Sequence, residues 1–297
     1  MTRLLATLLA SLVTTASAAA SGLAPGGYTE FDVELPADLR RIAGRGELSP
    51  VSRALVTVAV PADFDMARAW PVLVISATSD PGYRSSRRLL RDYAKTALES
   101  GWVVVAADAV QAGATLEDEV PLRLALNSAA LAVLRKQWPG GGKAPLAFGG
   151  FSGGAKHSCW LAAAFAKEGR TVIGLYLAGV NEETLVPAAK LFGVLDASFR
   201  RIPVFLQSGK GDEVATPADH RDVVSKLKRA GFTNLRLEYF QGTHEVEPGP
   251  LRSALDWYLE TAGLAGSQPV SSPKRPALAD EFPTDHATPP GQPPWQT

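Results

Sequence analysis

The central part of the chain alternates between short apolar runs and segments of helical periodicity. Continuous apolar runs at Pro71–Ala77, Trp102–Asp108 and Pro145–Phe151 are typical of strands that are buried on both faces of a parallel sheet. A helical pattern follows each of them, as over Ser86–Gly101, where apolar residues recur on one side. This alternation predicts a parallel sheet with helices packed on both of its faces.

The same pattern extends towards both ends of the chain. Thr29–Leu35 and Ala54–Pro61 alternate apolar and polar residues, as half-buried antiparallel strands do. Further strands are expected at Val172–Gly179, Ile202–Gly209 and Leu235–Gly242. The other helical segments are 119–138, 154–169, 217–231 and 250–263. With no internal repeat and no second apolar core, we predict a single doubly wound α/β domain over residues 21–265, built on a mostly parallel eight-stranded sheet.

Residues 1–20 have the features of a secretory signal peptide. Arg3 precedes an apolar run from Leu4 to Val13, and small residues follow at Ala16–Ala18. The run is much shorter than the about 20 apolar residues that cross a bilayer, so a membrane span is not expected. The protein is expected to be secreted or periplasmic, in a bacterium.

Composition excludes several classes of function. The 30 basic and 30 acidic side chains cancel, so no nucleic-acid partner is expected. Cys159 is the only cysteine, which excludes an intramolecular disulfide or a multi-cysteine metal site. No spacing of metal ligands and no dinucleotide-binding motif occurs, so neither a metal nor a cofactor is predicted. Residues 266–297 are rich in proline and predict a disordered tail.

A candidate nucleophile lies directly after the Pro145–Phe151 run. Gly150-Phe151-Ser152-Gly153-Gly154 matches G-x-S-x-G, the pattern of a serine on a sharp turn between a strand and a helix. Glycines and a serine also form ordinary turns, but this serine ends a buried strand and opens a helix. Its hydroxyl should lie at the carboxyl end of the sheet, where open α/β sheets bind their ligands.

A serine needs a base to accept its proton. Of the four histidines, His244 follows the last strand in a Gly-containing loop at the carboxyl end of the sheet. His157, on the helix after the serine, is expected to be a packing or surface residue. His220 is expected on the solvent face of its helix, and His286 lies in the tail. His244 is therefore the candidate base.

The base in turn needs an acid to orient it. Asp212 follows the Ile202–Gly209 strand and is the best candidate, with Glu213 as its neighbouring rival and Asp219 farther along in the helix.

Three stretches resemble those of the α/β-hydrolase superfamily, and the resemblance covers roughly residues 28–262. "GGFSGGAK" resembles the turn of dienelactone-hydrolase, phospholipase/carboxylesterase and polyester-depolymerase-like serine esterases. "GKGDEVATP" resembles their acid loop, and "GTHEV" their histidine loop. The resemblance implies Ser152 as nucleophile, Asp212 as orienting acid and His244 as base.

One loop departs from that family pattern. The strand at Pro71–Ala77 would normally run into a His-Gly pair that supplies one donor of the oxyanion hole, but Ala77-Thr78 stands there. We expect the N–H of Gly153 to be one donor and that of Thr78 or Ser79 to be the other. Losing a donor can cost about 10²–10³ in rate.

Only 22 residues separate the Val172–Gly179 and Ile202–Gly209 strands, which predicts a minimal lid and an open cleft. Such a cleft suits a small-molecule or polymer-attached ester. The leading hypothesis is a serine hydrolase of carboxylic esters. A catalytically weak or inactive binding protein and an exported serine peptidase remain alternatives, and the sequence does not indicate an oligomeric state.

Overall fold

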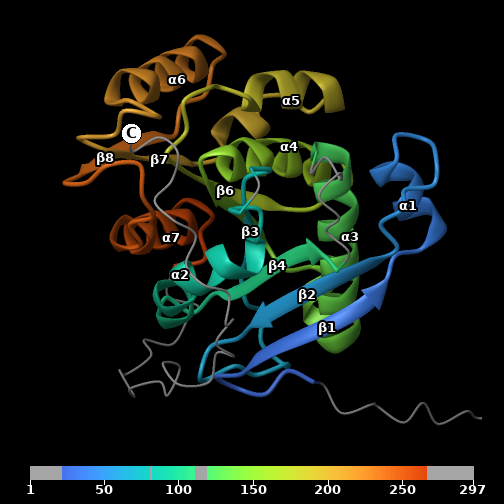
Figure 1. Ribbon diagram of the computed structural model, residues 1–297. Helices are drawn as coiled ribbons and strands as arrows, with labels where there is room; N and C mark the ends of the chain where they lie inside the picture. The colour runs from blue at the N-terminus through green and yellow to red at the C-terminus, as the bar shows by residue number, and fades with distance from the viewer. Residues whose placement is uncertain (1–21, 81, 111–118, 266–297) are drawn as a thin grey trace, which may run out of the picture.

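Eight strands form one sheet in the computed structural model, which describes residues 22–80, 82–110 and 119–265 (Figure 1). The strand order is β1-β2-β4-β3-β5-β6-β7-β8. The strands are β1 (Tyr28–Glu34), β2 (Arg53–Ala59), β3 (Val72–Ser76), β4 (Val103–Ala109), β5 (Leu146–Phe151), β6 (Val172–Ala178), β7 (Val204–Gly209) and β8 (Leu235–Phe240). The expected signal peptide and tail lie outside the described residues.

The pairing confirms the predicted mostly parallel sheet. β1 pairs antiparallel with β2, and β2 antiparallel with β4, whereas all pairs from β4 to β8 are parallel. β2 differs from the expected half-buried strand, because its last four residues are all buried. Its place inside the sheet, between β1 and β4, explains this burial.

Helices cover both faces of the sheet (Figure 1). They are α1 (Ala37–Ala43), α2 (Ser86–Glu99), α3 (Val120–Gln137), α4 (Gly153–Lys167), α5 (Leu185–Phe192), α6 (Pro217–Arg229) and α7 (Gly249–Thr261), with 3-10 turns η1 (Pro139–Gly142) and η2 (Phe199–Arg201). α2 and α7 enclose one apolar core, and α3, α4, α5 and α6 the other. In β3, Val72 and Val74 face one core while Leu73 and Ile75 face the other, which explains the continuous apolar run.

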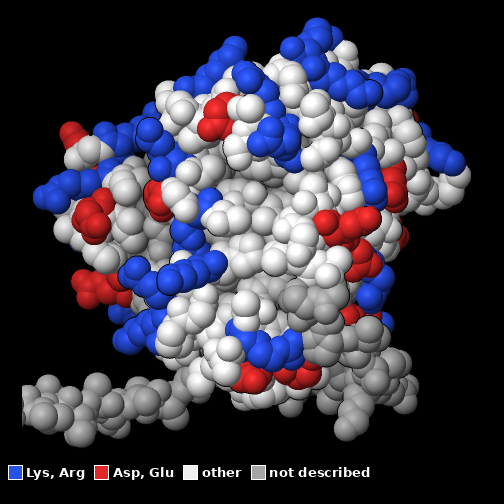
Figure 2. Space-filling view, turned by 180° about the vertical axis from the view of Figure 1, so that it is seen from behind, with Lys and Arg blue, Asp and Glu red and all other residues white. Residues whose placement is uncertain are grey.

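The connection between β6 and β7 holds only α5 and η2, as the predicted minimal lid requires. α5 packs against α4, with Leu185 buried and Leu191 73% exposed. No helix within the described ranges is both long and apolar enough to cross a membrane. On the face seen in Figure 2, basic and acidic side chains both surround an uncharged, hollowed centre.

Candidate active site

Ser152 occupies a strained turn between β5 and α4. It has φ 55° and ψ −122°, a left-handed region that residues with a side chain rarely adopt. Its own N–H donates to the carbonyl of Ala178 on the neighbouring strand at 2.9 Å. The turn therefore holds the serine at the carboxyl edge of the sheet, with Gly153 as the first residue of α4.

The glycines of the G-x-S-x-G pattern allow β5, α4 and the end of β3 to approach one another closely. A Cβ on Gly150 would lie 2.3 Å from the carbonyl carbon of Gly154, and a Cβ on Gly154 would lie 2.0 Å from the carbonyl oxygen of Ser76. Both contacts are with backbone, which has little freedom to move away. The pattern thus has a steric reason that is independent of any chemistry at Ser152.

Gly154→Ala is accordingly expected to destabilise the fold. The new methyl must displace α4 from the end of β3, and overpacking of this kind typically costs about 1–3 kcal/mol. Gly142→Ala is the matched control, because the three atoms nearest to a Cβ there all belong to the flexible side chain of Arg135. Urea denaturation should show a clear loss for Gly154→Ala alone. Equal stability of the two variants would contradict the steric account.

The structure brings Ser152, His244 and Asp212 together as a hydrogen-bonded chain. His244 Nε2 lies 3.1 Å from Ser152 Oγ, and His244 Nδ1 lies 2.8 Å from Asp212 Oδ2. The side chains of His244 and Asp212 are 6% and 1% exposed. With Nδ1–H donating to the carboxylate, the Nε2 lone pair is directed at the serine hydroxyl, which is the arrangement that general-base activation requires.

The Asp212 carboxylate is fixed by its own loop. While Oδ2 faces His244, Oδ1 accepts the N–H groups of Val214 and Ala215 at 2.8 and 2.7 Å. Neither rival acid takes this place: Glu213 is exposed, and Asp219 forms a capping box with Thr216 at the start of α6. Of the three candidate acids, the structure thus places Asp212 against His244.

Aromatic and backbone contacts fix the ring of His244. The ring of Phe151 lies 4.6 Å from it, centroid to centroid. Gly179, with φ 58°, leaves room for both rings, because a Cβ there would lie 2.7 Å from Phe151 and 3.1 Å from His244. The loop after His244 is tied to β7, where the Gln207 amide donates to the carbonyl of Glu247 at 2.8 Å.

The expected solvent-facing position of His220 is wrong. The residue is fully buried, its Nδ1 lies 3.1 Å from the Thr216 carbonyl oxygen, and its Nε2 accepts the N–H of Val180 at 3.2 Å. Burial lowers the pKa of His220, which keeps the ring neutral. It joins α6 to the loop after β6. His286 lies outside the described residues.

His157 is buried as well, and it contacts the loop that was expected to complete the oxyanion hole. Its Nδ1 lies 2.9 Å from the carbonyl oxygen of Ala77, and its Nε2 lies 3.2 Å from Ser79 Oγ. Burial lowers the pKa of His157 to about 4. The sequence placed His157 as a packing or surface residue, and nothing local in α4 indicated its partners 80 and 78 positions away.

Thr78 lies directly against the start of α4. The atoms nearest to a Cβ built on Gly153 are Oγ1, Cβ and Cα of Thr78, the first at 2.4 Å. The Thr78 hydroxyl donates to Asp80 Oδ2 at 2.9 Å. Because the first N–H groups of a helix have no acceptor within it, the N–H of Gly153 remains available as a donor at the start of α4.

A buried arginine also hydrogen-bonds to the loop that contains Thr78. Arg123 on α3 is 1% exposed, and its guanidinium donates to the carbonyls of Thr78 and Arg84 at 3.3 and 2.7 Å. It also pairs with Asp108 at the end of β4, at 3.3 Å. The sequence contained an indication of this role, because an arginine inside the largely apolar stretch "PLRLALNSAALAVL" needs buried partners.

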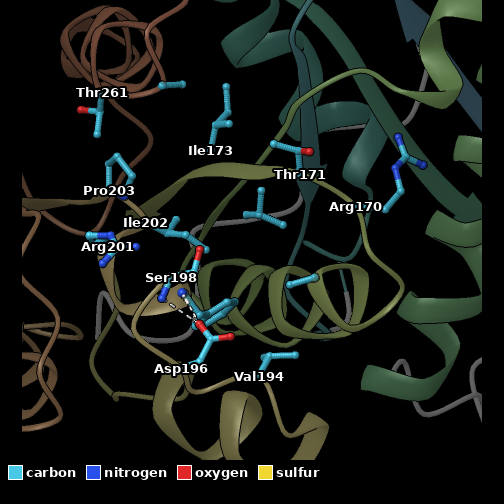
Figure 3. Close-up of a pocket in the computed structure, with 14 residues that line it drawn as sticks. Arg170, Thr171, Ile173, Val194, Asp196, Ser198, Arg201, Ile202, Pro203 and Thr261 are labelled. Atoms are coloured by element: carbon cyan, nitrogen blue, oxygen red, sulfur yellow. Dashed lines mark hydrogen bonds between the residues drawn. The ribbon is translucent and has the colours of Figure 1, made fainter.

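Within the part of the chain that the structure describes, other reactive groups do not form a second centre. Cys159 is buried, which raises its thiol pKa to about 12 and keeps it protonated. Within the described residues, no group of three or more His, Cys, Asp or Glu side chains could hold a metal ion. The pocket of about 450 Å³ in Figure 3 is lined by Val172, Ile173 and Pro203 among others. It lies where β6 and β7 begin, at the opposite edge of the sheet from Ser152.

Comparison with solved structures supports the fold. An α/β serine hydrolase without a lid from Xanthomonas campestris is 19% identical, with a TM-score of 0.53 over 80% of this chain and 96% of that one. A cold-adapted esterase from an Arctic intertidal metagenomic library is 15% identical, with a TM-score of 0.53 over 79% and 93%. An esterase from Pyrococcus furiosus is 17% identical, with a TM-score of 0.52 over 78% and 92%.

These similarities, together with the strand order, show that the chain has the α/β-hydrolase fold. At such identities they concern the fold alone. No family model matches the sequence, and no curated protein matches it either.

Proposed function

We propose that this protein is a serine hydrolase that cleaves carboxylic esters through an acyl-enzyme intermediate. The hydrogen-bonded chain from Ser152 Oγ through His244 to Asp212 is the observation that carries the proposal. The left-handed backbone at Ser152 adds to it, because such strain is concentrated at functional sites. Among proteins with this fold, several are described as esterases, which makes the ester bond the first substrate class to test.

The proposed reaction follows from the geometry. Ser152 Oγ attacks the ester carbonyl while His244 Nε2 takes its proton, and the resulting imidazolium is stabilised by Asp212. The N–H of Gly153 and that of Thr78 or Ser79 bind the oxyanion. Collapse of the tetrahedral intermediate expels the alcohol, which receives the proton from His244. Water, deprotonated by the same nitrogen, then releases the acid and restores Ser152.

The proposed setting is outside the cytoplasm. The features of residues 1–20 support export, to the medium or the periplasm. A single, buried cysteine is compatible with an oxidising compartment, because it offers no exposed thiol for unwanted pairing. Only α5 and η2 lie between β6 and β7, so no cap domain is inserted there. Such an open site suits a small-molecule or polymer-attached ester.

Labelling with a fluorophosphonate probe tests the proposal. Attack of Ser152 on phosphorus expels fluoride, and the phosphonylated residue is located by mass spectrometry of its peptide. Wild-type protein should carry the label at Ser152, and Ser152→Ala should carry none. The control is Ser158→Ala, in which a fully buried serine of the same helix is removed and labelling should persist.

A correctly folded wild-type protein that takes no label would contradict the proposal and favour a ligand-binding protein with this fold. If Ser152 is labelled, a panel of ester, lactone and peptide substrates then separates an esterase from a peptidase, since both use the same acyl-transfer groups.

A further inference from the structure

The loop from Ala77 to Ser79 is held from behind by two buried side chains. His157 Nδ1 lies 2.9 Å from the Ala77 carbonyl oxygen, and Arg123 Nη2 donates to the Thr78 carbonyl at 3.3 Å. Both successive carbonyls are thus occupied inside the protein. His157 is on α4, five residues after Ser152, and its contact with the loop is the shorter of the two.

The planarity of the peptide bond relates the Ala77 contact to the direction of the Thr78 N–H. In a planar trans peptide, the C=O of one residue and the N–H of the next point in opposite directions. Holding the Ala77 carbonyl towards His157 therefore directs the N–H of Thr78 away from His157. Thr78 itself lies against the start of α4, where its Cα is 3.3 Å from the position of a Cβ on Gly153.

The neutral ring with its proton on Nδ1 satisfies both contacts of His157. Donation from Nδ1–H to Ala77 leaves a lone pair on Nε2, and this nitrogen accepts the hydroxyl of Ser79 at 3.2 Å. In a charged ring the direction of this hydrogen bond would reverse, with Nε2–H donating to the Ser79 oxygen. Burial lowers the pKa of His157 to about 4, so the ring is neutral near pH 7 and both hydrogen bonds form.

We propose that His157 is a positioning residue that fixes the N–H of Thr78 as the second donor of the oxyanion hole. The inference rests on the proposed hydrolase function, and it explains how the hole is formed without a His-Gly pair in the loop. His157, on α4, holds the loop from Ala77 to Ser79 in place through its two hydrogen bonds. The residue acts through the Ala77–Thr78 peptide and does not itself contact substrate.

Three substitutions of His157 separate its two hydrogen bonds. His157→Phe keeps the ring but loses both. His157→Asn places an amide N–H where Nδ1–H was and so retains the contact with Ala77. His157→Gln reaches the Nε2 position, retaining the contact with Ser79 but not that with Ala77. Ser158→Ala, in which the next buried residue of α4 changes, is the matched control.

The readouts are kcat and KM for p-nitrophenyl acetate and Ki for phenylboronic acid, whose tetrahedral serine adduct places an oxygen in the hole. His157→Phe and His157→Gln should lose about 10²–10³-fold in kcat, as for one lost donor, with KM nearly constant. Their Ki should rise by a similar factor. His157→Asn and Ser158→Ala should stay within about tenfold of wild type in both kcat and Ki.

Wild-type kcat in His157→Phe, or a loss in His157→Asn as large as in His157→Gln, would overturn the inference. If His157→Phe does not fold, the comparison of the Asn and Gln variants decides. Ser152→Ala, assayed in parallel, separates the two proposals. Full turnover in Ser152→Ala overturns the hydrolase function and the inference with it. An inactive Ser152→Ala beside a fully active His157→Phe overturns the inference alone.

Discussion

Replacing Ser152 with alanine is expected to lower kcat for p-nitrophenyl ester hydrolysis by about 10⁶-fold, because the acyl-enzyme can no longer form. Residual catalysis would come only from substrate binding and the oxyanion donors. The fold should persist, since Ser152 contributes its N–H to Ala178 through the backbone and alanine keeps that hydrogen bond. The measurement is kcat on purified protein, together with the thermal unfolding midpoint.

Two results would contradict this expectation. Turnover within tenfold of wild type, in a preparation free of other esterases, would show that Ser152 is not the nucleophile. A variant that loses activity together with its cooperative unfolding transition would show that the serine is needed for the fold.

Asp212→Asn is expected to lower kcat by about 10⁴-fold while leaving the structure intact. The asparagine oxygen can still accept the N–H groups of Val214 and Ala215, so the loop keeps its shape. The amide NH₂ then faces His244 Nδ1, which must become an acceptor. The proton moves to Nε2, and the ring can no longer accept the proton of Ser152.

Asp219→Asn provides the control for this variant. Asp219 lies seven residues farther along, where its carboxylate caps α6 with Thr216. Its replacement should affect stability slightly and leave kcat within a few-fold of wild type. Comparable losses in both variants would mean that this region acts through loop stability rather than through the tautomer of His244. Steady-state kinetics on the two proteins, each checked by circular dichroism, decide between these outcomes.

Most of the sheet could be predicted because its pattern is set locally. Each central strand is buried on both faces and therefore reads as one apolar run, and helices such as α2 and α6 carry an apolar stripe. α1 was missed because it has seven residues, none of them buried, so no periodicity marks it. Its packing against the rest of the fold follows from neighbours distant in sequence.

The wrong expectation for His220 has a physical origin. In α6 the buried face is formed by His220, Val223 and Leu227, so the apolar stripe includes a histidine that polarity alone assigns to solvent. The hydrogen-bond partners of His220 that offset its burial can be identified only from the three-dimensional structure. The proximity of Ser152, Asp212 and His244 could be predicted because each follows a strand at the same edge of the sheet, a property that the order of elements already determines.

The three residues of the hydrogen-bonded chain belong to parts of the sequence that are far apart. His244 is 92 positions from Ser152 and 32 from Asp212, and the three follow β5, β7 and β8 respectively. A partly folded chain in which β8 has not yet paired with β7 would hold the serine on its turn without a base. Recovery of activity during refolding should therefore coincide with addition of the edge strand, so that an enzymatic assay reports completion of the whole sheet.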